Sequence, residues 1–533
     1  MTGRRPAAMA AYGVLGLFLL GEVAAIFIRT GHPVFFTLDD PYIHLALAEN
    51  IAHGVYGINP AEYASPASSI LYPFLLLPFA AIGLGDWEAL ALNLAASIGI
   101  LAVWRQLFVR FGFEGDNWET NIGALLATLA VNGVALPFTG MEHTLHVFCT
   151  LAVTSAIVDV AEGNPTPRFL IPVALAGALL RYEGGAVAGA AALVLIWSGR
   201  WRQAALLVAL VAIFYAGFSF FLHGLGLPFL PSSVLAKSDS ASTVAQDVGI
   251  AAIARSLLSH LAENMSTVHV VMLIVAALSG AVIYRRRQES EHESRLKLGF
   301  FGLAVLAVHI VAFRSGWFFR YEPYAVAVLL ACLGYALFSG LAVNGASLTG
   351  KVKWTWVGGF VSLILFASFY GIAISQTPMA ARNIFEQQYQ MHRFAVDFWR
   401  APVAVNDLGW VAYRNPDYVL DLRGLGLDDA RRAFARKDTK WMEQAVSSRH
   451  VGLAMIYKEW FKGFLPPSWT ELARLHMESE QITPASDTVS FYLLDPALRP
   501  KAETALKDFA ATLPNGATLD TDLKTVPDEA SDD

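Results

Sequence analysis

Residues 37–57, TLDDPYIHLALAENIAHGVYG, place two adjacent carboxylates directly after the first long apolar run of the chain. Asp40 precedes a proline, and this pattern predicts the start of a helix with Asp40 as its N-cap. Ile43 and Leu47 would then share one helix face, suited to an element that lies on a bilayer surface. A cap needs only one carboxylate, so Asp39 is left at the membrane edge, where it suits a general base. The alternative is that the pair only caps the helix.

The composition around this stretch predicts a membrane protein, because 55% of the 533 residues are hydrophobic and only 15% are charged. Apolar runs predict about eleven transmembrane helices. These runs lie near residues 9–28, 87–107, 120–138, 143–161, 169–181, 184–198, 203–222, 265–284, 298–313, 322–341 and 354–373. The segment 67–84 is expected to lie along the membrane without crossing it. A net charge of −6 and the absence of a basic patch indicate no nucleic-acid partner.

The basic residues that flank the runs predict the orientation of the chain. Most of them fall on the cytoplasmic side when the N-terminus is cytoplasmic, as the positive-inside rule requires. Residues 29–86 then form one long external loop within a transmembrane part that covers residues 1–375. The same count places everything after the last run outside the cell membrane.

Residues 376–533 have a different character, with shorter apolar runs and frequent charges. Four short pieces are typical of β-strands. They are PVAVND (402–407), DYVLDL (417–422), VGLAMIY (451–457) and SFYLLD (490–495). We therefore expect a soluble C-terminal α/β domain on the periplasmic or extracellular side.

Several motifs, taken in order, carry a resemblance to a known family. Residues 38–83 resemble the first external loop of the GT-C membrane glycosyltransferases, in which a DD or DE pair opens a juxtamembrane helix. Five later segments are similar to further motifs of that family. They are GMEHTLHVF (140–148), RYEGGAVAGAAALVL (181–195), LPFLPSSVLAKS (227–238), FFRYEPYAVAVLL (318–330) and VAVNDLGWVAYRNPDYVLDLRGLGLDD (403–429). His143 and the Pro-Ser-Ser of residues 231–233 depart from the family pattern.

The resemblance is to the polyprenyl-phosphate-sugar-dependent branch, which includes mycobacterial arabinofuranosyltransferases and enzymes similar to protein mannosyltransferases. It implies a bacterial plasma-membrane enzyme that transfers a sugar, with inversion, from a polyprenyl phosphate donor. The acceptor would be a cell-envelope glycan, lipid or protein on the external face. Two other functions remain open: a polytopic transporter or lipid flippase, and a glycan-binding membrane protein without catalysis.

Under the leading hypothesis, Asp39 is the base, and Asp40 caps the helix, orients the acceptor or binds a cation. Arg181, Lys237 and Arg320 would hold the donor phosphate, since cations pair with phosphate oxygens. The alternative for the two arginines is an ion pair with a neighbouring glutamate or snorkelling to the interface. For Lys237 the alternative is a solvated loop residue.

Four further residues are expected to contact substrate. Glu142 and Glu183 lie near the expected outer ends of helices, and His44 follows the aspartate pair. Tyr42 could stack on a sugar, although aromatic belts at membrane interfaces are built from the same residues. The chemistry requires no cofactor. A divalent cation held by Asp40, His44, Glu142 or His146 is a further alternative.

Overall fold

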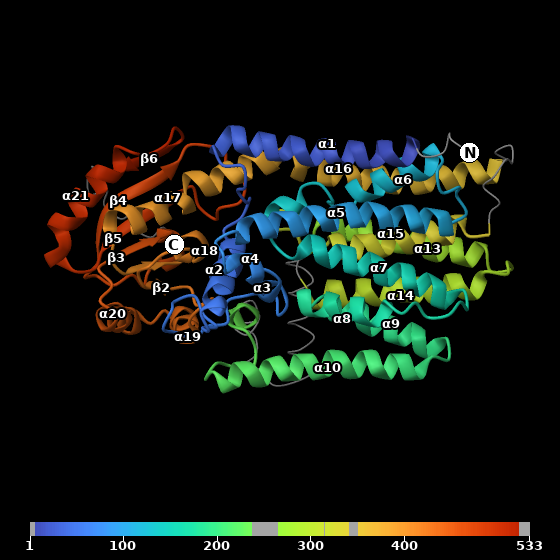
Figure 1. The fold of residues 1–533 in the computed structure, drawn as a ribbon, viewed down its shortest axis with the longest axis horizontal. Helices are drawn as coiled ribbons and strands as arrows, with labels where there is room; N and C mark the ends of the chain where they lie inside the picture. Colours follow the sequence, from blue (N-terminus) through green and yellow to red (C-terminus); the bar gives the residue numbers. More distant parts are fainter. Residues whose placement is uncertain (1–5, 237–264, 314, 341–349, 522–533) are drawn as a thin grey trace, which may run out of the picture.

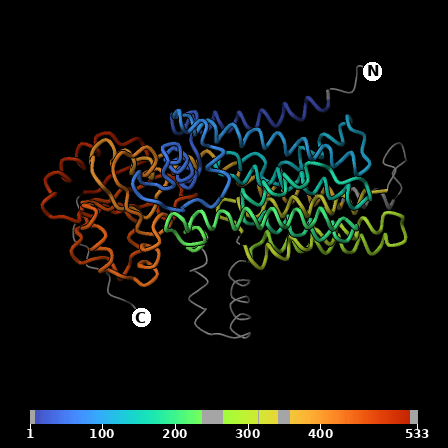
Figure 2. The backbone as a smooth tube through the Cα atoms, turned by 60° about the horizontal axis from the view of Figure 1, so that its bottom comes forward, coloured from blue at the N-terminus to red at the C-terminus, as the bar shows by residue number. Residues whose placement is uncertain are grey.

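The computed structural model describes residues 6–236, 265–313, 315–340 and 350–521. The molecule is elongated, with a bundle of long helices and an α/β domain at one end of it (Figure 1). The long helices run nearly parallel to one another, and the view in Figure 2 shows the same separation into two parts. The first helix begins at the end of the bundle far from the domain and runs toward it.

The helices of the bundle differ in length. Among the described residues, seven are long and apolar enough to cross a membrane. They are α1 (Pro6–Thr30), α5 (Gly85–Arg110), α7 (His143–Ala161), α10 (Trp201–Gly224), α13 (Thr267–Arg285), α14 (His292–Ala312) and α16 (Gly350–Glu386). Shorter helices complete the bundle: α6 (Trp118–Leu129), the 3-10 helix η1 (Leu136–Thr139), α8 (Leu170–Leu180), α9 (Gly184–Trp197) and α15 (Pro323–Phe338).

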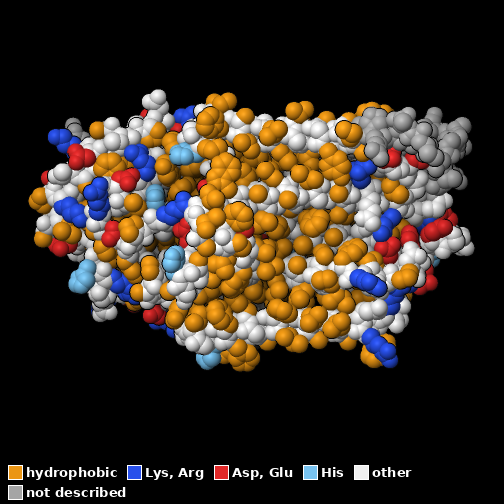
Figure 3. All heavy atoms as spheres, in the orientation of Figure 1, with side chains coloured by type: hydrophobic (Ala, Val, Ile, Leu, Met, Phe, Trp, Pro, Cys, Tyr) orange, Lys and Arg blue, Asp and Glu red, His pale blue; other side chains and the backbone are white. Residues whose placement is uncertain are grey.

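An apolar band covers the face of the bundle that Figure 3 shows. Figure 3 shows hydrophobic side chains over the middle of the molecule, with charged side chains gathered over the domain and at the opposite end. A soluble protein would hide so much apolar surface from water, whereas a bilayer covers it. The protein is therefore an integral membrane protein, as the composition predicted.

The run at residues 120–138 does not form one continuous spanning helix. Helix α6 ends at Leu129, and the chain then turns at Asn132, which has a φ of +58°. Pro137 follows within η1, and its ring restricts φ and removes a backbone donor. Backbone conformation thus ends α6, although the apolar composition continues past it.

The loop between α1 and α5, residues 31–84, is called the first loop below. It contains α2 (Asp40–Ala52), α3 (Tyr72–Leu75) and α4 (Leu77–Ala80). The last two have four residues each, which is far too short to cross a bilayer. The first loop packs between the bundle and the domain (Figure 1).

Helix α2 does not lie on a bilayer surface, and this expectation was wrong. All its residues from Pro41 to Ala48 are buried, so it has no lipid-facing stripe. It contacts α3 and α4 on the bundle side and α18 (Gly409–Ala412) of the domain. The apolar spacing of α2 reflects burial between two parts of the protein. Spacing alone does not distinguish this kind of burial from burial among lipid headgroups.

The C-terminal α/β domain contains a six-stranded sheet in the order β2-β1-β3-β5-β4-β6. The strands β1, β2 and β3 pair in parallel, and β3, β5, β4 and β6 pair antiparallel. The strands are β1 (Val403–Val405), β2 (Val419–Asp421), β3 (Leu453–Ile456), β4 (Thr470–Met477), β5 (Thr488–Leu493) and β6 (Ala517–Asp520). Three of the four predicted strand pieces contain β1, β2 and β3, and the fourth, residues 490–495, overlaps β5 from residue 490 to Leu493.

Helices cover the sheet and connect it to the bundle. They are α17 (Gln388–Arg393), the π-helix η2 (Phe394–Trp399), α18, α19 (Asp428–Arg436), α20 (Thr439–Ser448), η3 (Lys458–Phe461), η4 (Pro496–Leu498) and α21 (Arg499–Ala510). Helix α16 passes through residue 376 without interruption and leads into α17. One continuous hydrophobic core extends from α1 to β6, so the domain is packed onto the bundle.

Candidate active site at the boundary of bundle and domain

Asp39 is held by the C-terminal domain. Its carboxylate accepts hydrogen bonds from the backbone N–H of Gly409 at 2.7 Å and of Trp410 at 2.8 Å. These two amides lie at the start of the short helix α18. The expected arrangement was therefore wrong in one respect: Asp39 is not a carboxylate left over from capping α2. It fastens the first loop to the domain.

Asp39 shares this buried region with Asp407 of the domain. Burial raises the pKa of Asp39 well above its ordinary value, and the Asp407 carboxylate adds to the rise, while the two amide hydrogen bonds oppose it. Burial also raises the pKa of Asp407, which accepts hydrogen bonds from Gln388 at 3.0 Å and Tyr457 at 2.9 Å. The two carboxylates therefore disfavour each other's ionisation.

Asp40 lies in a different environment, although it is the next residue. It is the first residue of α2, and no side-chain cap is formed at this helix start. Its carboxylate lies 2.6 Å from Nη2 of Arg320, and its side chain keeps 40% of its surface exposed. Of the two aspartates, Asp40 is thus the one with an accessible carboxylate beside a cation.

Arg320 is positioned by buried contacts but is not fully paired. Its side chain is only 4% exposed, and Nη2 also donates to the Tyr321 hydroxyl at 2.9 Å. The Nε and Nη1 atoms are buried without a hydrogen-bond partner among the described residues. Arg320 does not pair with Glu322, whose carboxylate accepts a hydrogen bond from the Gly316 N–H at 2.9 Å. Two buried N–H-bearing nitrogens therefore remain for an anionic ligand.

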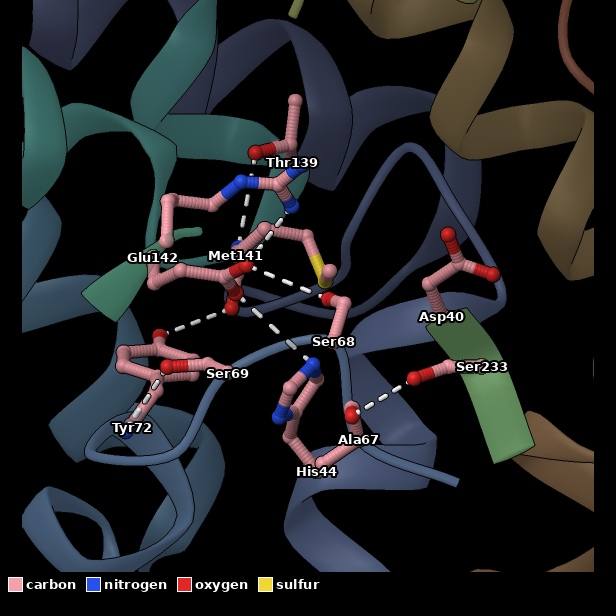
Figure 4. A network of polar contacts seen from close by, with 12 residues as sticks. Asp40, His44, Ala67, Ser68, Ser69, Tyr72, Thr139, Met141, Glu142 and Ser233 are labelled. Carbon is pink, nitrogen blue, oxygen red and sulfur yellow. Dashed lines mark hydrogen bonds and ion pairs between the residues drawn. The ribbon is translucent and has the colours of Figure 1, made fainter. Parts of the chain in front are cut away.

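A second group of charges lies close by and is called the Glu142 cluster: His44, Glu142, Arg181 and Glu183. Nη1 of Arg181 lies 3.0 Å from Glu142, and its Nη2 lies 2.5 Å from Glu183. The Ser68 hydroxyl donates to Glu142 at 3.2 Å (Figure 4). Both carboxylates of the cluster thus share one guanidinium, as the alternative of a neighbouring ion pair anticipated for Arg181.

His44 faces the same carboxylate from α2. Its Nε2 lies 3.7 Å from Glu142, too far for a hydrogen bond. Burial lowers the pKa of His44, although the Glu142 carboxylate opposes this shift. A neutral imidazole therefore faces Glu142, and its Nδ1 has no hydrogen-bond partner among the described residues.

Tyr321 connects the two groups of charges. Its ring centroid lies 5.0 Å from the guanidinium of Arg320 and 5.6 Å from that of Arg181. Both distances fit a cation–π contact. The sequence around Tyr321 carries no local signal for this role, because Tyr321 is like any aromatic residue of an interface belt.

Tyr42 lies outside both groups. Its ring packs on Trp410 with a centroid distance of 4.0 Å, and its hydroxyl accepts a hydrogen bond from the Phe36 N–H at 3.2 Å. This side chain is almost completely buried between the first loop and the domain. Its contacts are those of a packing residue, and no open face is left for a sugar.

Two further expectations concern the loop around residue 237 and a bound cation. The Ser233 hydroxyl donates to the Ala67 carbonyl at 2.8 Å (Figure 4). This hydrogen bond holds the segment that leads to residue 237 against the first loop. Lys237 lies outside the described residues. Within the described part of the chain, no three His, Cys, Asp or Glu side chains are grouped as a metal site requires.

Comparison with solved structures identifies the fold. ArnT from Cupriavidus metallidurans in the apo state superimposes with a TM-score of 0.50 at 12% identity, covering 92% of this chain and 99% of that chain. The chain has the GT-C fold. This confirms the fold that the motifs implied. In this GT-C fold, the Asp40–Arg320 pair and the Glu142 cluster lie where the bundle meets the domain.

Other comparisons cover parts of the chain or agree less closely. The Archaeoglobus fulgidus oligosaccharyltransferase in its apo form matches with a TM-score of 0.45 at 12% identity, over 90% of this chain and 75% of that chain. The family model of a domain of unknown function, DUF8728, matches residues 382–492, most of the C-terminal domain. No curated protein sequence matches the chain.

Proposed function

We propose that this protein transfers a sugar from a polyprenyl phosphate donor to a hydroxyl group of a cell-envelope glycan, lipid or protein on the outer face of the membrane. The observation that carries the proposal is the Asp40–Arg320 pair. It combines a partly exposed carboxylate with a buried guanidinium, two of whose nitrogens have no hydrogen-bond partner among the described residues. A base and an anion-binding group are the two elements that this reaction needs.

Asp40 is the proposed general base. The acceptor oxygen attacks the anomeric carbon, the bond from that carbon to the phosphate oxygen breaks, and the acceptor proton moves to Asp40. The bonding electrons leave with the polyprenyl phosphate, which departs as an anion and needs no strong acid. Asp39 is less suited to this role, because both its oxygens accept backbone hydrogen bonds.

Arg320 is the proposed phosphate-binding residue. Its Nε and Nη1, which have no partner in the described part of the chain, would bind phosphate oxygens while Nη2 remains with Asp40. Protonation of Asp40 would remove the negative charge that shares this guanidinium. The attraction between Arg320 and the leaving phosphate would therefore grow as the reaction proceeds, which is the condition for catalysis.

The Glu142 cluster has a positioning role in this proposal. Arg181 is already paired with two carboxylates, so it has little capacity for a phosphate. Arg181 instead contacts the Tyr321 ring, which in turn contacts Arg320. Glu142, Glu183 and His44 act through this contact and not on the substrate directly.

The test is a transfer assay on purified protein in nanodiscs. Release of free polyprenyl phosphate is measured for a panel of labelled polyprenyl-phosphate pentoses and hexoses, with crude cell-envelope acceptor. Asp40→Asn is expected to lower turnover by about 10²–10⁴-fold and to keep donor binding. Asp39→Asn is the matched control, expected to lower thermal stability more than turnover per folded molecule.

Two outcomes would overturn the proposal. Folded wild-type protein that neither binds nor turns over any donor in the panel would remove the transferase function. Turnover that survives Asp40→Asn but is lost in folded Asp39→Asn would return the role of base to Asp39.

A further inference from the structure

A cavity of about 320 Å³ lies where the segment before α15 meets the C-terminal domain. On the bundle side it is lined by Trp317 and Phe318. On the domain side it is lined by residues 481–485, in the connection between β4 and β5. We call it the boundary cavity. It takes no part in the Asp40–Arg320 pair or the Glu142 cluster.

The bundle wall of the boundary cavity is a left-handed turn. Gly316, Trp317, Phe318 and Phe319 have φ values of +89°, +43°, +59° and +56°. Residues other than glycine rarely adopt this conformation, and a run of three requires surrounding contacts that hold it. The Asn132 side chain supplies one such contact by donating to the Phe319 carbonyl at 2.9 Å. The Trp317 side chain is thereby directed outward and stays 55% exposed.

The domain wall is anchored to the end of α16. The Asn383 side chain donates to the Glu480 carbonyl at 2.9 Å and accepts from the Ile482 N–H at 2.7 Å. The Gln387 side chain donates to the Ser486 carbonyl at 2.8 Å. Both ends of the 481–485 segment are therefore fixed, and the cavity has two supported walls.

The lining has the chemistry of a neutral polar ligand. Thr483 is only 8% exposed, and its hydroxyl has no hydrogen-bond partner among the described residues. A buried hydroxyl in this state favours a ligand that supplies a partner. No Asp, Glu, Lys or Arg occurs among the described residues that line the cavity. The exposed Trp317 ring offers an apolar face beside this hydroxyl.

We propose that the boundary cavity binds a neutral sugar unit of the acceptor, a role that rests on the proposed sugar transfer. Trp317 precedes Arg320 by three residues, so their Cα atoms lie within about 11 Å of each other. An acceptor glycan held at Trp317 and Thr483 would thus lie near the Asp40–Arg320 pair. The cavity volume of about 320 Å³ lies at the lower end of the range for small-ligand sites.

Saturation-transfer NMR with neutral disaccharides tests this proposal on the full chain in nanodiscs. The panel contains gluco-, galacto-, manno- and arabino-configured disaccharides. Trp317→Ala is expected to weaken binding of the best disaccharide by about tenfold, and Thr483→Val by several-fold. Trp87→Ala, at another exposed aromatic residue, is the matched control and should bind as wild type does.

Asp40→Asn separates this proposal from the proposed function. It should lower transfer by about 10²–10⁴-fold and leave disaccharide binding unchanged. Disaccharide binding that needs Trp317 and Thr483 would support the cavity even if no donor is turned over. Donor turnover without any disaccharide binding would overturn the cavity proposal alone. Donor turnover with disaccharide binding that is equal in Trp317→Ala, Thr483→Val and wild type would do the same. A signal dependent on Trp317 that comes from short-chain phospholipid, and not from any disaccharide, would identify a lipid site and also overturn it.

Discussion

Arg320 and Asp40 are 280 positions apart in the chain, and their side chains meet at 2.6 Å. The contact joins the segment before α15 to the start of α2. It brings together two motifs that the sequence assigned to one reaction, but whose direct contact no local pattern predicted.

Replacing Arg320 by lysine should show whether donor affinity depends on the positive charge alone or also on the planar shape of the guanidinium. Lysine keeps the positive charge, but it lacks the planar fork that can hold a carboxylate and a phosphate together. We expect donor affinity to fall about tenfold, a loss of about 1.4 kcal/mol of binding free energy. Binding of a fluorescent polyprenyl-phosphate sugar measures this. Unchanged affinity in Arg320→Lys would contradict phosphate binding by the guanidinium.

Gly409 is expected to be essential for the attachment of the first loop. A Cβ at this position would lie 2.0 Å from the Asp39 carbonyl oxygen, a contact that backbone atoms cannot relieve without moving. Gly409→Ala should therefore cost about 1–3 kcal/mol of stability by overpacking and lower the melting temperature. Gly189→Ala is the control, because a Cβ there meets no atom within 4 Å. Equal melting temperatures for the two variants would contradict the tight contact.

The buried aspartates should make stability depend on pH. Burial, and for Asp39 also the Asp407 carboxylate, raises the pKa of both groups, so the folded state binds protons more tightly than the unfolded chain. Stability should then fall as pH rises from the unfolded pKa, about 3.9, toward the raised folded values. Asp407→Asn should reduce this fall. Melting temperatures between pH 5 and 8 measure it, and a wild type that gains stability relative to Asp407→Asn over this range would refute it.

Arg181 should matter for folding more than for donor contact. Removing its charge in Arg181→Met leaves Glu142 and Glu183 buried without their shared cation, which costs about 3–5 kcal/mol. Adding Glu183→Gln should recover part of the loss, because one uncompensated charge is removed. Denaturation of the purified variants in detergent provides the comparison. A double variant no more stable than Arg181→Met would argue against the shared ion pair.

Local patterns predicted the parts of the fold that depend on local chemistry. The aspartate pair does open a helix, and the alternating or apolar pieces at residues 402–407 and 451–457 contain strands β1 and β3. Strand β4, Thr470–Met477, was missed because it contains polar residues at several positions and only part of it is buried. Edge strand β6 is short, and a run of four residues carries little signal.

The roles of the two aspartates could not be read from the sequence. Asp39 binds amides 370 and 371 positions away, and no periodicity in the first loop indicates such partners. The sequence indicated both Arg181 and Arg320 as donor-phosphate ligands, but it could not show that Arg181 is already paired with two carboxylates. That pairing depends on three-dimensional distances of a few ångströms.

Helix α16 connects the apolar band to one wall of the boundary cavity. It continues from the apolar band to Glu386, and Asn383 within it and Gln387 directly after it hold the loop that forms one wall of the boundary cavity. The height of that wall above the lipid is therefore set by a count of helical residues, about 1.5 Å for each, and not by a flexible linker. If the boundary cavity holds the acceptor, as proposed, the length of α16 sets how far that acceptor must extend from the membrane.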